Sequence, residues 1–192
     1  GGRVNWGAGR GFDAKEYETF GVSREDSYPK FREHLDVVLK AWTNERLTYH
    51  GQFCDYDDVE VLPKPLQSPH PPVWVASSSP DAIAWSASQG FDILMDPHAS
   101  HAEIGAKRAL YRTELEAAGH SIEGRYIPMA RNIALGRTQA DAEAVARRGA
   151  EFMFGSYLRK PGSVRAATQE KSIQMDAVSA ADASPEERVE RY

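Results

Sequence analysis

The chain has 192 residues, and its 23 Lys and Arg against 28 Asp and Glu give a formal net charge of −5. It contains no basic block and no run of about 18 apolar residues, so neither nucleic acid nor a membrane is an expected partner. Its single cysteine, Cys54, excludes an internal disulfide and fits a reducing, cytoplasmic location.

The first expected element is a short strand at residues 3–7 that runs into a glycine-rich turn at residues 7–12. Gly9 and Gly11 flank Arg10, and glycines let the backbone turn tightly while a guanidinium points into the space above the strand end. Spacing alone leaves two interpretations open, an anion clamp or a turn with a solvated Arg10.

A helix is expected next at residues 27–43, because the apolar positions fall on one stripe that can pack on a sheet. The stripe consists of Phe31, Leu35, Val38, Leu39 and Trp42. Residues 47–61 then alternate about a His-Gly turn, which predicts a surface β-hairpin. Its clustered acids Asp55, Asp57 and Asp58 are interpreted as a solvated edge, since they lack the spacing of a calcium loop.

Residues 73–76 form a short apolar run that is typical of a buried parallel strand feeding a helix. Ser79 is placed as the N-cap and Pro80 as the first helical residue, and Gly90 ends the pattern. Ser77, Ser78 and Ser79 therefore fall where strand becomes helix, and there backbone N–H groups, hydroxyls and the helix dipole can bind a phosphate. The alternative is an ordinary capped turn.

The remaining chain repeats the same unit. A strand is expected at residues 91–95, a helix with a Ser100–Glu103 capping box ends at Gly119, and a strand within 127–135 precedes a helix capped by Thr138. This alternation predicts a parallel sheet wound as a (β/α) barrel or an open doubly wound sheet.

Four strands can be counted, whereas a complete barrel has eight. We therefore expect residues 1–192 to form one incomplete (β/α)8 TIM barrel domain that lacks strands on both sides. The hairpin is an excursion from it, and residues 159–192 are a poorly defined loop and helix tail.

Six motifs, in order and at matching intervals, carry a resemblance to the bacterial luciferase-like flavin-dependent monooxygenases. They are Gly-Arg-Gly at 9–11 and the segments 16–22, 41–43, 49–51, 62–67 and 71–80. The resemblance implies a (β/α)8 barrel, of which this chain is an internal segment covering about strands four to seven. It also implies reduced FMN, or in one branch the deazaflavin F420, at the C-terminal mouth of the barrel.

Residue by residue, the resemblance places Arg10 on the flavin phosphate, with Ser78 and Ser79 as the phosphate-binding pair and Ser77 beside them. Gly9 lies where relatives pack backbone near the flavin ring, next to Gly11, and Phe12 is a candidate wall of that pocket. No catalytic residue can be named.

His98 follows the sixth strand of the implied barrel, so it is a candidate for substrate contact. A solvated or capping role for His98 and His101 stays open, as does metal binding with Asp96, for which the geometry is unsecured.

The resemblance implies an oxidoreductase, chiefly a monooxygenase that uses reduced FMN, O2 and a small organic substrate, with a flavin reductase as a partner and homo-oligomers possible. Three alternatives remain: an F420-dependent hydride-transfer enzyme, a non-catalytic flavin-binding protein, and another phosphate-binding barrel enzyme such as an aldolase or isomerase. The segment alone is not expected to turn over.

Overall fold

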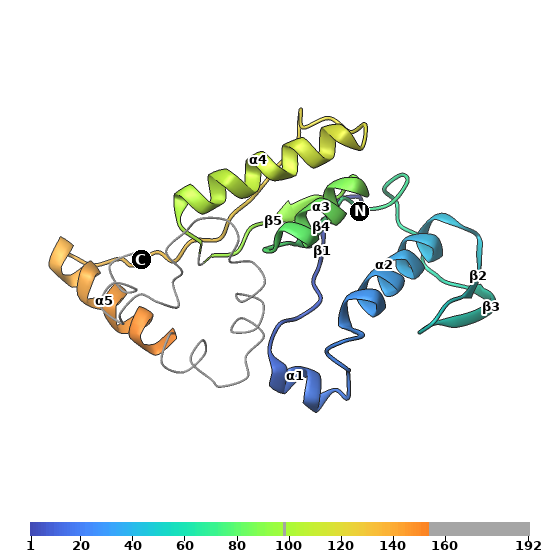
Figure 1. The fold of residues 1–192 in the computed structure, drawn as a ribbon, viewed down its shortest axis with the longest axis horizontal. Coiled ribbons are helices and arrows are strands. Elements are labelled where there is room, and N and C mark those ends of the chain that lie inside the picture. Colours follow the sequence, from blue (N-terminus) through green and yellow to red (C-terminus); the bar gives the residue numbers. More distant parts are fainter. Residues whose placement is uncertain (98, 154–192) are drawn as a thin grey trace.

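Each strand of a parallel sheet is followed by one or two helices, and an antiparallel hairpin precedes the second of these strands (Figure 1). The computed structural model describes residues 1–97 and 99–153. The elements are β1 (Trp6–Ala8), α1 (Ala14–Thr19), α2 (Ser27–Thr43), β2 (Arg46–His50), β3 (Asp55–Glu60), β4 (Val73–Ala76), α3 (Pro80–Ser88), β5 (Asp92–Leu94), α4 (His101–Ala117) and α5 (Gln139–Phe152). None of these helices combines the length and apolarity needed to cross a bilayer.

Three strands form one parallel sheet in the order β1-β4-β5. Ala8 of β1 pairs with Val75 of β4, and Val75 in turn pairs with Ile93 of β5. Because these three residues are paired, they share one face of the sheet. All three are buried on that face, where the helices pack.

Two apolar clusters join the helices to this face. One combines Leu35 of α2 with Ala8, Val73 and Val75, as the α2 stripe predicts. The other combines residues of α3, of β5 and the position after it, and of α4, namely Ile83, Ala87, Ile93, Met95, Tyr111 and Leu115. Burial of these side chains, worth roughly 1.5–3 kcal/mol for each large one, fixes the helices against the strands.

The opposite face of the sheet is lined by small residues near its carboxyl edge. A Cβ built on Gly9 would lie 3.8 Å from Ala76 Cβ, and one on Gly7 would lie 3.8 Å from a methyl group of Leu94. Gly9 and Ala76 are both exposed. This face therefore has open space above it where β1 and β4 end.

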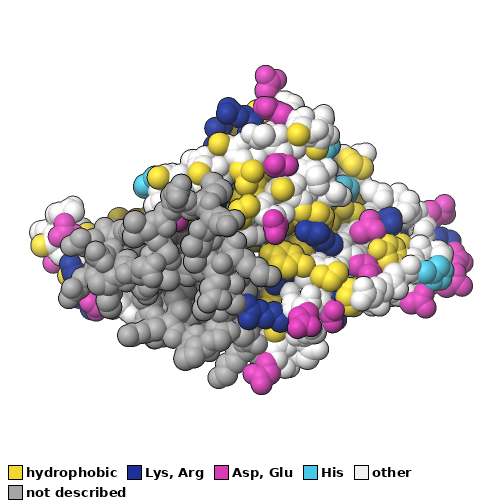
Figure 2. Space-filling model, in the orientation of Figure 1, with side chains coloured by type: hydrophobic (Ala, Val, Ile, Leu, Met, Phe, Trp, Pro, Cys, Tyr) yellow, Lys and Arg dark blue, Asp and Glu magenta, His cyan; other side chains and the backbone are white. Residues whose placement is uncertain are grey.

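The predicted hairpin is confirmed as the antiparallel pair β2–β3. Acidic side chains gather at the margin of the molecule where the hairpin lies (Figure 2). It is held to α2 by Glu33, whose carboxylate accepts hydrogen bonds from the backbone amides of Gln52 (3.0 Å), Phe53 (2.8 Å) and Cys54 (2.7 Å). Burial raises the pKa of Glu33, but these three amides outweigh it and lower the pKa below its ordinary 4.5.

The prediction of a strand within residues 127–135 is wrong, because the structure has no strand there. Only Met129 pairs, in one parallel bridge to Met95, and Met95 N donates to Pro128 O at 3.1 Å. Ile133 and Leu135 are more than four-fifths exposed. An apolar alternation becomes a strand only where a neighbour supplies the hydrogen-bond ladder, and the described residues supply none beyond Met129.

Two further predictions are adjusted. The first strand begins at Trp6, later than the expected residues 3–7. The predicted tail at 159–192 and the residue His98 lie outside the described residues.

Candidate functional site

The arginine turn and the serine turn leave adjacent strands at the same edge of the sheet. Ala8 of β1 pairs with Val75 of β4, so residues 9–12 and 77–79 both follow at the carboxyl end. The carboxyl ends of parallel strands are where ligands bind in α/β folds. The pairing shows that the two turns leave adjacent strands, while the convergence of Arg10, Ser78 and Ser79 on one phosphate, which the family resemblance implies, stays a prediction.

The Arg10 side chain is held from one side by residues of α1 and α2. Its Nη1 donates to the hydroxyl oxygens of Tyr17 and Ser27, both at 2.8 Å. Its guanidinium carbon lies 4.0 Å from the centroid of the Tyr28 ring, a cation–π contact. Arg10 forms no ion pair with a carboxylate within the described part of the chain.

Gly11 adopts a φ of +81°, a conformation that disfavours other residues. The turn brings its carbonyl within 2.7 Å of the Tyr17 hydroxyl. Phe12 follows with 43% of its surface exposed, so it is available to form part of a wall.

The three serines of the second turn have three different environments. Ser77 is buried, and its hydroxyl lies 2.9 Å from that of Ser86 in α3. Ser79 is the N-cap of α3 as predicted, since its hydroxyl accepts from the amide of Ala82 at 3.3 Å. Ser78 is exposed, and its hydroxyl forms no hydrogen bond among the residues that the structure describes.

The groups at this edge are of the kinds that bind anions in proteins. Arg10 supplies a positive charge, Ser78 an open hydroxyl, and the start of α3 the positive end of a helix dipole with first-turn amides. Asp81, exposed in the first turn of α3, opposes this in part. The residue types are those that a phosphate monoester requires.

The loop after β5 follows its strand at the same edge of the sheet. Its described polar side chains have partners within the protein or start a helix, and they do not form the metal-binding group that was left open from sequence. Asp96 is paired with Lys107 of α4 at 2.8 Å, and His101 is exposed as the first residue of α4. The confirmed capping box of Ser100 and Glu103 starts that helix. Substrate contact by His98 stays a prediction.

The partners of Arg10 were missed from sequence. The sequence patterns placed Tyr17 only within the motif at 16–22 and Ser27 only at the start of the helix at 27–43. Both are buried, at 8% and 3% exposure. A polar residue at the start of a helix is common in sequences. It points to a buried hydrogen bond only once the fold shows that the residue is buried.

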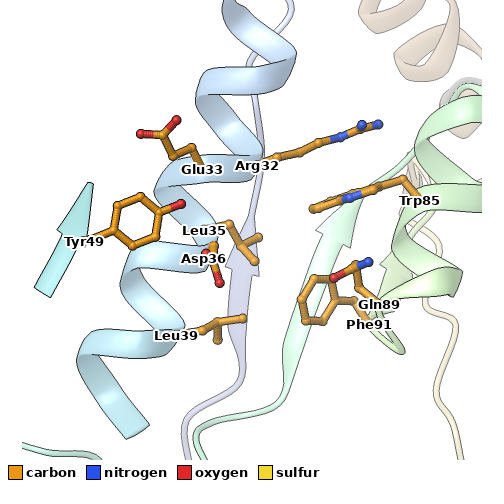
Figure 3. Close-up of a pocket in the computed structure, with 9 residues that line it drawn as sticks. All are labelled: Arg32, Glu33, Leu35, Asp36, Leu39, Tyr49, Trp85, Gln89 and Phe91. Carbon is orange, nitrogen blue, oxygen red and sulfur yellow. The ribbon is translucent and has the colours of Figure 1, made fainter. Parts of the chain in front are cut away.

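A separate pocket of about 310 Å³ lies between α2 and α3 (Figure 3). Leu35, Leu39 and Phe91 form its apolar wall, and Arg32 extends from α2 to lie 4.9 Å from the Trp85 ring centroid. These residues belong to the face that the helices cover. The pocket is therefore distinct from the edge where residues 9–12 and 77–79 follow the strands.

The cysteine does not contribute a nucleophile to this edge. Cys54 is buried in the turn between β2 and β3. Burial, followed by the charge of Glu33, raises the pKa of its thiol.

The fold is that of an α/β protein with a parallel sheet, and two turns that carry the predicted site residues leave adjacent strands at its carboxyl edge. The chain belongs to the luciferase-like monooxygenase family, whose profile matches residues 1–192. It is 24% identical over 163 residues to the oxygenase component of the flavin-dependent trigonelline monooxygenase of Acinetobacter baylyi, covering 82% of this chain and 45% of that protein. The chain spans less than half the length of the curated relatives it matches first.

Two solved structures show the same fold. One is the oxygenating constituent of 3,6-diketocamphane monooxygenase from Pseudomonas putida in complex with FMN, with a TM-score of 0.69 and 18% identity over 99% of this chain and 56% of that one. The other is an F420-dependent secondary alcohol dehydrogenase in complex with an F420-acetone adduct, with a TM-score of 0.68 and 15% identity over 99% and 55%. The fold is thus shared by enzymes of both cofactor branches.

Proposed function

We propose that this chain forms the phosphate-binding part of a flavin-dependent monooxygenase that uses reduced FMN and O2 on a small organic substrate. The observation that carries the proposal is the pairing of β1 with β4, because it brings the turn of Arg10 beside the turn of Ser78 and the start of α3. The family membership supports the general enzyme class.

The residues present fit a flavin phosphate. Nε and Nη2 of Arg10 have no protein partner among the described residues, and Ser78 offers a free hydroxyl there. We assign the phosphate to Arg10, Ser78, and the cap region of Ser79, and leave out the hydroxyl of Ser77, which joins β4 to α3. When bound, reduced flavin would supply the oxygen-activating chemistry.

The opposite face of the sheet, which small residues line near its carboxyl edge, leaves room for a flat flavin ring next to the phosphate. Gly9 and Ala76 place no bulky side chain where β1 and β4 end. Phe12 is exposed at the same turn and is available to cover an apolar ring. These residues would bind and orient the cofactor and exclude water from it.

The test is a titration of the protein with FMN and with riboflavin, which lacks the phosphate, for wild type and Arg10→Ala. We expect Arg10→Ala to weaken FMN binding about 10- to 150-fold, the value of a hydrogen bond to a charged group, and to leave riboflavin nearly unchanged. Equal losses for both ligands would refute the phosphate site.

An F420-dependent oxidoreductase is the second candidate, because the fold likeness extends to an F420 enzyme. Parallel titration with F420 separates the two, since the preferred cofactor binds more tightly. Flavin binding without substrate-dependent oxygen uptake would instead favour a non-catalytic flavin-binding protein.

A further inference from the structure

The orientation of Arg10 is determined by two hydroxyl groups whose protons are already donated elsewhere. The Tyr17 hydroxyl donates to the Gly11 carbonyl at 2.7 Å. The Ser27 hydroxyl donates to the Arg24 carbonyl at 2.6 Å. Each hydroxyl has one proton, so toward Arg10 both oxygens act as acceptors.

Both acceptors contact the same nitrogen. Tyr17 and Ser27 each lie 2.8 Å from Nη1 of Arg10, which carries two protons, so the donors of Nη1 are fully used. Nε and Nη2 keep three protons between them. Together these two nitrogens form one edge of the planar guanidinium, with the spacing that binds two oxygens of one phosphate or carboxylate.

The surroundings make this arrangement rigid. Tyr17 and Ser27 are buried, and the ring of Tyr28 lies against the guanidinium at 4.0 Å. No carboxylate among the described residues pairs with Arg10. The neutral acceptors at Nη1 do not neutralise the guanidinium, so its positive charge can still attract an anionic ligand. Because the side chain is already held in place, it loses little conformational entropy when that ligand binds.

We propose that Tyr17 and Ser27 are positioning residues that hold Nη1 of Arg10 so that its Nε–Nη2 edge binds two oxygens of a phosphate monoester. This inference rests on the proposed function, since it assigns the phosphate-binding edge of the same arginine. It also explains why two buried hydroxyls from α1 and α2 converge on one surface arginine.

The experiment is a double-mutant cycle between Tyr17→Phe and Arg10→Ala, read by titration with FMN and riboflavin. Tyr17→Phe keeps the buried ring and removes only the hydroxyl. We expect about 3- to 10-fold weaker FMN binding, the effect of one neutral hydrogen bond, with riboflavin unchanged. In the Arg10→Ala background the Tyr17 change should no longer weaken FMN more than riboflavin, because the remaining bonds of the Tyr17 hydroxyl go to the backbone carbonyls of residues 10 and 11 and do not reach the phosphate.

Tyr28→Phe is the matched control. It makes the same chemical change beside the same guanidinium, but the Tyr28 hydroxyl forms no hydrogen bond within the described residues, and the ring contact is kept. We expect wild-type binding of both flavins. Ser27→Ala should repeat the Tyr17→Phe result, and urea unfolding of each variant confirms that it is folded at the titration conditions.

The outcomes separate the two proposals. Wild-type FMN affinity in Tyr17→Phe, or the same loss in the presence and absence of Arg10, would overturn the positioning role while leaving the phosphate site of Arg10 intact. Failure of the wild type to bind FMN, or equal FMN and riboflavin losses in Arg10→Ala, would overturn the proposed function itself.

Discussion

Alanine substitutions at Ser77, Ser78 and Ser79 should have three different effects, although the residues are chemically identical and adjacent. Ser78 is the one expected to act on ligand. Its side chain is exposed and forms no hydrogen bond with a described residue, so Ser78→Ala should change the free energy of unfolding by less than about 0.5 kcal/mol. A lost hydrogen bond to a phosphate costs about 1.5–3 kcal/mol, which is about 10- to 150-fold in the dissociation constant for FMN.

The two neighbours should act on stability instead. Ser77→Ala leaves the fully buried hydroxyl of Ser86 without its 2.9 Å partner, which costs about 1–3 kcal/mol. Ser79→Ala removes the cap of α3, which costs about 1 kcal/mol. Because Ser79 also orders the amides at the helix start, we expect a smaller loss of FMN affinity than in Ser78→Ala.

Two measurements on each variant are sufficient, a urea unfolding curve and a titration with FMN and riboflavin. The reasoning is refuted if Ser78→Ala lowers the unfolding midpoint as much as Ser77→Ala does. It is also refuted if Ser78→Ala weakens riboflavin as much as FMN, because the hydroxyl would then act on something other than the phosphate.

Three further predictions concern the elements that position this edge. Gly11→Ala should destabilise the protein by roughly 1–2 kcal/mol in urea unfolding because of its φ of +81°, whereas Gly9→Ala, whose Cβ would make an ordinary 3.8 Å contact, should not. Tyr111→Phe should cost about 1–2 kcal/mol, since it removes the buried donor 2.8 Å from the Phe91 carbonyl, and an unchanged midpoint would contradict this. Glu33→Gln should lower the midpoint at pH 7. The folded pKa of Glu33 lies below its ordinary 4.5, so the unfolded chain binds more protons, stability rises with pH there, and the difference from wild type should shrink as pH falls below about 4.5. A difference that stays constant as the pH falls below 4.5 would contradict the pKa argument.

The helix boundaries could be predicted because their signals are local. Ser79, the Ser100–Glu103 box and Thr138 each accept from an amide within their own first turn, as the sequence indicates. A cap needs no distant partner, so its sequence pattern is enough. The pairing of β1 with β4 had no such local signal, because two helices and a hairpin separate the two strands in the chain, and only the family resemblance implied that their turns come together.

The inward position of Ser77 had a signal in the sequence that the prediction did not use. Val73 and Val75 point to the buried face of β4, and a period of two carries that face on to Ser77. Assigning Ser77 to the phosphate ignored this alternation. Ser78, one residue on, has the opposite parity and is exposed.

The contacts of Arg10 could not be predicted in the same way. They join residues 7 and 17 positions apart across two turns, and neither Tyr17 nor Ser27 belongs to an apolar period. The Tyr17 and Ser27 hydroxyls accept from Arg10 because each donates its proton to a backbone carbonyl, and the tertiary structure places those carbonyls. The failed strand at residues 127–135 has a related cause, since pairing beyond Met129 depends on a partner and not on the segment itself.

One physical rule separates the structural from the ligand-binding groups at this edge: a buried polar group must have a hydrogen-bond partner. The hydroxyls of Tyr17, Ser27, Ser77 and Ser79 all have partners within the protein. Of the side chains assigned to the two turns, Ser78 and the Nε–Nη2 edge of Arg10 are the described groups that do not. Both groups follow paired strands at the carboxyl edge of the sheet, and the proposal that one phosphate contacts both is what the FMN and riboflavin titrations of Arg10→Ala and Ser78→Ala test.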